Sequence, residues 1–455
     1  MSESCSLPVP LRVGAARISI TPASPQWLDG YGSRTGPSEG VYLELHARGL
    51  ALQSGDVRII LVAAEVLGFD RTRTPALKAR IAAATGVPDH HVVLMATHTH
   101  CAPRVSDMVM PGRVDLEYVA WFEDRCVETA QAAVARLTPA HASVSRAQDP
   151  GVGINRRLPV GTGVTARPNP EGPHDRDIDT LWFTDPSAPT GTPFASLTIA
   201  ACHPTCRGGQ LVGGDYPGFL CRDLERAHQS IALFALGCAG DVRPHFTTET
   251  GNFRMAELAE VEAAGSRLAA EVLHSRDRTF ALDVPFLSVL HKVVDAPLCP
   301  PPAADALSGI SRTDTNALRR EWAAWLLEQR NPPSQVPLEL QVLRLGADLS
   351  IVFWPGEVVA DYALWLKGQE TGERQLTDTP DHHPGPPTRG DESAPRILIA
   401  AYANGTVGYV PSRHMYARGG YEVDGSHYYY RLPAPYAPEV EDCLRDATLR
   451  LLGEH

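Results

Sequence analysis

The sequence predicts an α/β fold with mixed β-sheets and flanking helices. Short apolar segments of strand length alternate with longer segments of helical periodicity along most of the chain. Segments 57–66, 74–85 and 91–96 read as strand, helix and strand, an order that joins parallel strands. Segments 43–52 and 57–66 flank the turn Ser54-Gly55-Asp56 and predict an antiparallel hairpin. Parallel and antiparallel pairs together indicate mixed sheets.

The composition is that of a globular protein that acts on something other than nucleic acid. Of 455 residues, 43% are hydrophobic and 21% are charged, and the formal net charge is −12. Lys and Arg form no cluster longer than a pair, which argues against nucleic acid or an anionic membrane surface as the main partner. No apolar run reaches the length of a transmembrane helix, so we expect no integral membrane segment.

The cysteine content and the N-terminal residues indicate the cellular compartment in which the protein is expected. Nine cysteines without framework spacing fit reduced thiols. Residues 1–10 lack the pattern of a secretory signal. We therefore expect a cytoplasmic protein. The sequence does not indicate an oligomeric state.

The elements of the first half follow from periodicity and from turn residues. Gly86 and Pro88 end the helix at 74–85, and apolar positions along one stripe predict a long amphipathic helix at 115–137. A Gly/Pro-rich polar loop is expected at 159–177. The further strands predicted in this half are 11–20, 142–152, 180–183 and 195–201.

The second half continues the alternation up to a polar insertion. Strands are expected at 231–236, 282–294, 338–345, 349–354 and 396–401, and helices at 217–228, 253–274, 316–330, 357–367 and 438–452. Residues 368–395 are rich in Gly, Pro and charge, and predict a surface loop or a lid. With no internal repeat and no clear linker, we expect one domain spanning 1–455.

A His-x-His motif stands at the end of the strand 91–96. If the backbone stays extended, alternation places His98 and His100 on the same face, where both imidazoles face a common point. Pro103 follows and ends the strand. Such a pair is typical of metal sites, but two half-buried structural histidines at a strand end would produce the same motif.

The same local pattern recurs at other strand ends. Apolar strands stop at Gly- or Pro-marked turns that carry His203, Asp241 and Glu357. Sites in parallel sheets gather beyond the carboxyl ends of the strands. Two or three histidines with one carboxylate form the ligand set of a catalytic zinc, which lowers the pKa of bound water to about 7. The pattern favours a metal hydrolase.

Six short motifs, in order, resemble those of the neutral (non-lysosomal) ceramidase family. They are Ala96-Thr97-His98-Thr99-His100, Asn155-Arg156, Cys202-His203-Pro204-Thr205, Gly240-Asp241-Val242-Arg243-Pro244, Gly356-Glu357 and Asn404-Gly405-Thr406-Val407-Gly408-Tyr409-Val410. The likeness begins at Val13-Gly14 and runs to about Tyr421, so it covers most of the chain. Each motif alone is weak, whereas six in order are specific.

The resemblance implies a ceramidase-like catalytic domain with one zinc ion per chain. In that family the metal is held by the first His of His-x-His, a second strand-end His, a Glu and a Tyr. These correspond here to His98, His203, Glu357 and Tyr409. A tyrosine can bind zinc as a phenolate because the metal offsets its normally high pKa.

The resemblance also implies the remaining catalytic groups. His100 is the expected proton carrier, while Arg156 and Tyr421 are expected to bind the substrate carbonyl and its oxyanion. Donors placed where negative charge develops stabilise the transition state. An amine leaves poorly unless it is protonated, and a positioned acid contributes about 10²–10⁴-fold.

Structural alternatives exist for these residues. His203 could be a packed loop histidine, and Glu357 could sit in the first turn of its helix, where the dipole favours it. Tyr409 and Tyr421 could be ordinary pocket-wall aromatics. Asp241 is expected to fix its own turn or to support a ligand histidine rather than to bind metal.

The departures from the family pattern concern the substrate. Cys101-Ala102 and Cys206-Arg207 replace small polar residues after the histidine motifs, and Arg243 stands where a serine is typical. The 368–395 insertion lengthens the spacing between Glu357 and Tyr409. The C-terminal β-sandwich domain of ceramidases is not expected here. The proposed metal ligands are all present, so these changes affect only the expectation that the substrate is ceramide.

We therefore predict a zinc-dependent hydrolase of linear amides. The expected partner is a small-molecule N-acyl amine, ceramide-like or smaller. The alternatives are a zinc esterase or deacetylase acting on a non-lipid substrate, and a non-catalytic binding protein that retains the fold. The presence of His100, Arg156 and Tyr421 together favours catalysis.

Overall fold

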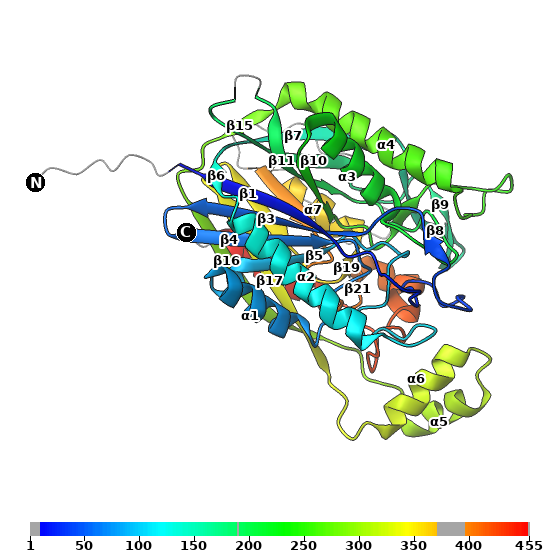
Figure 1. Cartoon of the computed structure of the whole chain (residues 1–455). Helices are drawn as coiled ribbons and strands as arrows, with labels where there is room; N and C mark the ends of the chain where they lie inside the picture. Colours follow the sequence, from blue (N-terminus) through cyan, green and yellow to red (C-terminus); the bar gives the residue numbers. More distant parts are fainter. Residues whose placement is uncertain (1–9, 189–190, 371–395, 454–455) are drawn as a thin grey trace, which may run out of the picture.

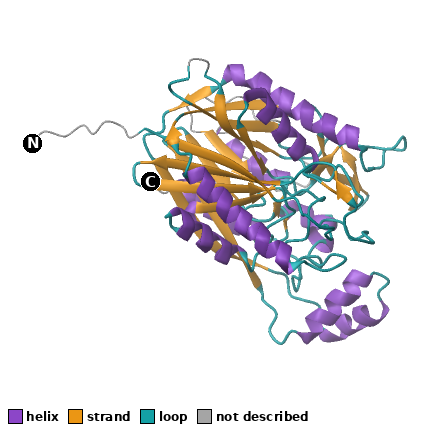
Figure 2. Cartoon of the chain, viewed as in Figure 1, coloured by secondary structure: helices purple, strands orange, loops and turns teal. Residues whose placement is uncertain are grey.

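The fold is a mixed α/β arrangement of several sheets with helices on the outside (Figure 1). A computed structural model describes residues 10–188, 191–370 and 396–453. Figure 2 shows the strands gathered in the interior and most of the helices along two outer faces. The predicted fold class is therefore confirmed.

The first large sheet carries the His-x-His segment at its edge. Its strands, in spatial order, are β5 (Val92–Ala96), β4 (Val57–Ala64), β3 (His46–Ser54), β1 (Arg12–Ser19) and β6 (Thr138–Pro139). β3 and β4 form the predicted antiparallel hairpin, and β4 and β5 are parallel. α1 (Thr74–Thr85) and α2 (Leu116–Val134) cover the outer face. α2 approaches β1 closely because Gly14 has no Cβ, which would lie 2.1 Å from the Ala133 carbonyl oxygen.

The second large sheet lies against the first. Its strands are β13 (Ile231–Leu236), β11 (Pro193–Ala200), β10 (Asp177–Thr184), β7 (His141–Gln148) and β15 (Phe280–Leu282). β11 and β13 are parallel, while β10 and β11, which contain the predicted strands 180–183 and 195–201, are antiparallel. α3 (Asp215–His228) and α4 (Leu258–Ser275) pack on its outer face.

A four-stranded sheet and three small ones complete the β-structure of the described residues. The four-stranded sheet contains β16 (Leu287–Pro297), β17 (Gln335–Leu345), β18 (Leu349–Phe353) and β20 (Arg396–Ala400). The small sheets are β14 (Val242–Pro244) with β8 (Gly153–Val160) and β9 (Gly163–Asn169), β2 (Gly40–Val41) with β12 (Leu211–Val212), and β19 (Glu357–Val358) with β21 (Tyr409–Val410). α7 (Ala360–Glu370) and α8 (Val440–Gly453) lie beside the four-stranded sheet.

One apolar core is shared by the three larger sheets. Each sheet contributes fully buried aliphatic side chains to it, such as Leu61, Leu197 and Ile351. Burial of such side chains stabilises the fold by about 1.5–3 kcal/mol each. The sheets are therefore held face to face, which fixes their strand ends relative to one another.

The parallel strand pairs of the three sheets end at the same place. β4 and β5 end at Ala64 and Ala96, and β11 and β13 end at Ala200 and Leu236. Backbone hydrogen bonds cross between the sheets there, from Ala401 N to the Leu236 carbonyl at 2.8 Å and from Ala96 N to the Tyr402 carbonyl at 3.2 Å. The loops after these strands consequently meet at one point, as expected for a site at carboxyl ends of strands.

Some predicted elements differ from the structure. The predicted loop 159–177 contains β9, which pairs with β8 as a hairpin. The predicted helix 357–367 begins only at Ala360, because Glu357 and Val358 pair with β21. The predicted helix 253–274 begins at Leu258, where Glu257 and Glu260 form a capping box. The predicted insertion 368–395 starts within α7 up to Glu370, and 371–395 lie outside the described residues.

Two helices project from the body of the molecule. The proline-rich region before the predicted helix at 316–330 contains an additional helix, α5 (Ala304–Thr313), which packs against α6 (Ala317–Glu328). Figure 1 shows this pair standing apart from the sheets. Among the described residues, no helix combines the length and the apolar character needed to cross a membrane.

Candidate metal centre

His98 leaves the strand direction instead of continuing it. β5 ends at Ala96, and His98 has a φ of 64°, in the left-handed region. The expectation of an extended His-x-His segment is therefore wrong. A left-handed residue other than glycine is uncommon and is held by its surroundings. Here the His98 amide donates to the Val66 carbonyl at 2.9 Å, and the ring Nδ1 donates to the Leu67 carbonyl.

The three motif histidines converge on one point. Nε2 of His203 lies 3.1 Å from Nε2 of His98 and 3.1 Å from Nε2 of His100. His98 and His203 are buried, whereas His100 is half-buried. One ligand atom from each of the three histidines lies within 4.8 Å of the others, so the cluster could hold a metal ion. The turn at His98 achieves the convergence that we had expected from strand alternation.

Glu357 adds a carboxylate to this cluster. Its Oε2 lies 3.4 Å from His98 Nε2 and 3.7 Å from His203 Nε2. The Tyr430 hydroxyl donates to the other oxygen, Oε1. The residue lies on β19 after Gly356, whose φ of 77° suits glycine. The alternative that Glu357 occupies the first turn of α7 is therefore wrong.

The hydrogen bonds around the cluster leave the Nε2 lone pairs of His98 and His203 facing the carboxylate of Glu357. Nδ1 of His203 lies 3.3 Å from the Ala239 carbonyl, so both His98 and His203 use Nδ1–H as a donor and present an Nε2 lone pair. Glu357 Oε2 is buried and has no hydrogen-bond partner among the described residues. Two lone pairs and a carboxylate oxygen at these distances repel one another unless a cation lies between them. The donor set therefore fits a bound metal ion.

Burial sets the protonation preferences of the cluster. Burial lowers the pKa of both His100 and His203 well below the ordinary value, and the neighbouring His98 lowers each of them further. Burial alone would raise the pKa of Glu357, but its interactions with the neighbouring His98, Tyr409 and Tyr430 side chains hold it below its usual value. Neutral imidazoles beside an ionised carboxylate are the protonation states that bind a metal.

Arg156 stands beside the cluster in a fixed orientation. Its Nε donates to Glu422 Oε1 at 2.8 Å, and its Nη2 donates to the Gly240 carbonyl at 2.8 Å and to the Tyr409 hydroxyl at 3.2 Å. Among the described residues, Nη1 has no hydrogen-bond partner. The guanidinium is thus held from three sides and retains one free donor nitrogen.

The two predicted tyrosines lie on the Arg156 side of the cluster. Tyr409 on β21 is in register with Glu357 on β19, and Arg156 lies 5.6 Å from the ring centres of both Tyr409 and Tyr421. The Tyr409 and Tyr421 rings are 5.3 Å apart, and Tyr421 is 44% exposed in the first residue of a π-helical turn. Tyr409 is therefore a buried neighbour of the carboxylate, and Tyr421 lies at the solvent side.

Several residues at the site were not predicted from their motifs. Tyr430 reaches Glu357 from a loop in which the run Tyr428-Tyr429-Tyr430 was the only signal. Tyr31 lies with its ring 4.8 Å from that of His100, and Gly30 allows the approach because a Cβ there would be 2.3 Å from His100 Nδ1. The glycines on either side of Tyr31 in the sequence do not indicate this contact.

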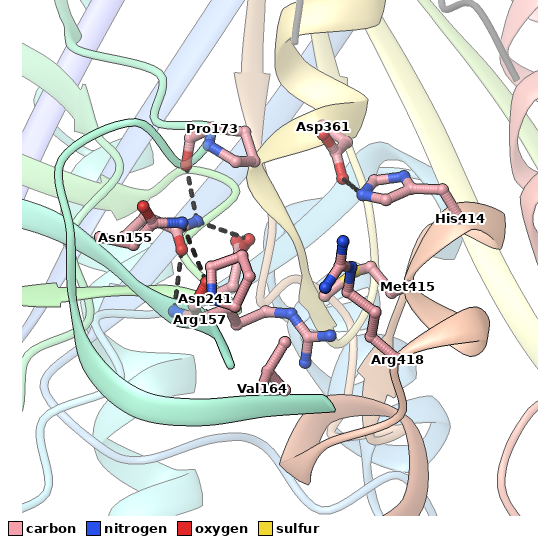
Figure 3. Close-up of a pocket in the computed structure, with 11 residues that line it drawn as sticks. Asn155, Arg157, Val164, Pro173, Asp241, Asp361, His414, Met415 and Arg418 are labelled. Carbon is pink, nitrogen blue, oxygen red and sulfur yellow. Dashed lines mark hydrogen bonds and ion pairs between the residues drawn. The ribbon is translucent and has the colours of Figure 1, made fainter. Parts of the chain in front are cut away.

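Within the described part of the chain, Asp241 contacts neither its own turn nor a histidine of the cluster through its carboxylate. Its Oδ1 accepts from the Ala360 amide at the start of α7 at 2.8 Å, and its Oδ2 accepts from Asn155 Nδ2 at 2.9 Å. Burial raises its pKa to about 7, and Asp361 adds to the shift. Asp241 lines a cavity of about 70 Å³ that none of the three histidines lines. Figure 3 shows Asp241 beside Asn155 in the lining of this cavity. Asp241 thus joins β8 to α7.

Comparisons with known proteins identify the fold. No protein-family model matches the chain, and no curated protein matches its sequence. Neutral ceramidase from Pseudomonas aeruginosa has a TM-score of 0.70 and 19% identity, over 96% of this chain and 73% of that one. A ceramidase complexed with C2 has a TM-score of 0.68 and 18% identity, over 96% of this chain and 74% of that one. The predicted resemblance is confirmed at the level of structure, and this chain has the fold of the neutral ceramidases.

Proposed function

We propose that this chain is a zinc-dependent hydrolase that cleaves a linear amide bond. The observation that supports it most strongly is the convergence of unprotonated acceptors from His98, His203 and Glu357 beside the fixed guanidinium of Arg156. Imidazole and carboxylate ligands suit zinc. A zinc ion held there would supply a Lewis acid and a water whose pKa is lowered to about 7.

The ligand roles follow from the contacts of each side chain. His98 and His203 are oriented by backbone carbonyls at Nδ1, and Glu357 is oriented by Tyr430. Such outer contacts keep ligands in place and increase their basicity. Tyr409 is assigned as the fourth ligand because it lies in register with Glu357.

His100 is assigned as the proton carrier. Glu357 Oε2 lies within 4 Å of the Nε2 atoms of His98 and His203, whereas no such contact with His100 exists among the described residues, and His100 is the most exposed of the three. Because burial keeps its imidazole neutral, Nε2 can take a proton during attack and deliver it to the leaving amine. That transfer makes the amine a competent leaving group.

Arg156 and Tyr421 are assigned to the substrate carbonyl. Nη1 of Arg156 has a free donor, and the Tyr421 hydroxyl belongs to a ring in contact with Tyr409 at the exposed side. Donors fixed before the reaction stabilise the developing oxyanion at little reorganisation cost. The ceramidase fold suggests a lipid-like amide as the substrate, an N-acyl amine of ceramide size or smaller.

Metal analysis of purified full-length protein tests the centre. We expect about one zinc per chain, and His98→Ala, His203→Ala and Glu357→Ala should each lose most of it. His141→Ala is the control, because this histidine is exposed on β7. Less than about a tenth of one zinc per chain in the wild type would contradict the proposal.

Turnover of a fluorogenic N-acyl amide separates His100 from the ligands. His100→Ala should keep its zinc and lose about 10²–10⁴-fold in kcat. Loss of zinc in this variant would instead make His100 a ligand. Retained zinc with wild-type turnover would remove His100 from the mechanism.

A further inference from the structure

Arg243 lies next to the metal centre through the backbone of β14. The His203 amide donates to the carbonyl of Val242 at 3.1 Å, which places the following residue, Arg243, beside the histidine loop. Across the β14–β8 pair, Arg243 is opposite Ile154, two residues before Arg156. Cross-strand partners share a face, so Arg243 lies on the same side of this pair as Ile154, next to the irregular turn of β8 that contains Arg156.

The guanidinium of Arg243 has no anionic partner. It stacks on the ring of Phe253 at 4.4 Å, its Nε is buried, and it makes no ion pair or hydrogen bond with any residue that the structure describes. The carboxylate of Glu422 is already shared by Arg156 and Arg157. Leaving a largely enclosed cation unpaired is unfavourable, and proteins commonly do so where a ligand supplies the counter-charge.

Two neighbours place this charge at the substrate side of the centre. Burial lowers the pKa of Arg243, and the positive charge of Arg156 lowers it further. Arg243 also interacts electrostatically with the hydroxyl of Tyr31, whose ring packs against His100. The guanidinium is thus near Arg156, the proposed oxyanion donor, and near Tyr31, whose ring packs against the proposed proton carrier.

We propose that Arg243 binds a carboxylate of the substrate, so that the amide cleaved is an anionic N-acyl compound of the N-acyl amino acid class. This inference rests on the proposed function. Arginine presents a planar fork of donors that matches a carboxylate with two hydrogen bonds. In the reaction, water adds to the acyl carbon and the C–N bond breaks. The products are a fatty acid and a free amino acid, whose nitrogen takes the proton from His100.

Binding to the metal-free protein tests the charge contact apart from catalysis. Decanoylglycine and decanoylethanolamide share an acyl chain and an amide, and they differ in a carboxylate against a hydroxymethyl group. Calorimetry on the chelated full chain should show decanoylglycine binding about tenfold or more tightly, a preference that weakens with salt. Arg243→Ser should abolish the preference, and Arg243→Lys should retain part of it because the charge remains without the fork.

Arg222→Ser is the matched control. Arg222 also stacks on a phenylalanine, Phe219 at 4.7 Å, but it is paired with Asp223 and Glu262 on the surface. Its replacement should leave the preference for decanoylglycine intact. Equal affinity of the wild type for both compounds, or a preference that survives Arg243→Ser, would overturn the inference.

Hydrolysis by the zinc-loaded chain separates this inference from the proposed function. We expect the ratio of kcat/KM for decanoylglycine to that for decanoylethanolamide to exceed about ten, and to fall to near one in Arg243→Ser. Turnover of the neutral amide with a ratio near one in the wild type would overturn the carboxylate assignment alone. Binding preference without turnover of either compound would overturn the hydrolase and leave the Arg243 contact standing.

Discussion

The carboxylate of Glu357 is divided between two environments. Oε1 accepts a hydrogen bond from Tyr430, whereas Oε2 faces two imidazole nitrogens that carry no proton. A buried carboxylate with one unsatisfied oxygen is costly, and this cost favours any cation that enters the cluster. The same hydrogen bond that orients Glu357 therefore contributes to metal affinity without contacting the metal.

Replacing Tyr430 with Phe should weaken zinc binding. The change removes the donor to Oε1 and keeps the ring, so we expect a loss of about 10–100-fold in metal affinity with the fold intact. Competition with a chelator measures it. Tyr429→Phe is the control, since the Tyr429 hydroxyl makes no hydrogen bond among the described residues. Equal zinc affinities for wild type and Tyr430→Phe would show that Tyr430 does not support the centre.

The residues of the site differ in how far the sequence predicts them. His98, His203 and Glu357 each follow an apolar strand at a marked turn, so their type and position indicate a common edge. Tyr430 carries no such signal, because its contact depends on how a distant loop folds back over β19. The bend at His98 was also unpredicted, since its left-handed φ is imposed by the Leu67 carbonyl and neighbouring strands.

At the scale of elements, α6 supports the loop that contains Tyr430. The Trp322 indole donates to the Leu432 carbonyl at 2.8 Å, and its ring lies 5.3 Å from His427 and 4.9 Å from Tyr428. The projecting pair α5 and α6 consequently connects to the metal centre through the loop residues Tyr428, Tyr429 and Tyr430, the last of which contacts Glu357. A change in this contact should reach Glu357 through Tyr430.

Acidification should loosen this contact through His427. Burial, with a smaller effect from Arg319, lowers the pKa of His427 from 6.5 to about 4. Between pH 6.5 and pH 4, His427 is protonated in the unfolded chain but neutral in the folded chain. The folded state is therefore fully stabilised by the neutral His427 above about pH 6.5, and this stabilisation declines toward pH 4. The total effect is on the order of 3 kcal/mol.

Unfolding free energies at pH 7.5 and 4.5 measure this effect. Relative to His427→Gln, the wild type should lose at least about 2 kcal/mol more between the two values. His141→Gln, at an exposed position on β7, serves as the control. A pH dependence that is the same in wild type and His427→Gln would refute the role of this histidine.

Elements with local signals were predicted well, and elements that depend on partners were not. α1 agrees with prediction at both ends, because Gly86 adopts a φ of 70° and stops it. The start of α7 was predicted too early because pairing of β19 with β21, residues 409–410, overrides local helical preference. The sequence predicts a loop where β9 lies, since the polar residues of this strand pair with β8 without entering the apolar core.

At the scale of the molecule, ion pairs in the interior tie the sheets together. α7 comes between β18 and β20 of the four-stranded sheet and directly after the Glu357 segment. The Lys367 ammonium nevertheless lies among carboxylates of the second sheet and of the segment before β10. Its Nζ is 2.9 Å from Asp175, 2.9 Å from Asp177 and 3.4 Å from Asp179. The Lys367 charge thus holds α7 against β10. Because Glu357 directly precedes α7, the same contact helps to position this proposed metal ligand.

Replacing Lys367 with Met should destabilise the whole fold. Lys367 is 3% exposed, and its removal leaves Asp175 buried without its cation, whereas Arg146 still pairs with Asp177 and Asp179. Breaking a buried pair in this way costs about 3–5 kcal/mol. Urea unfolding of chelated protein measures it free of metal binding. Lys292→Met, on β16 and without an ion pair among the described residues, should change the unfolding free energy by less than about 0.5 kcal/mol. If Lys367→Met were equally mild, the sheets would have to be held by the shared apolar core alone.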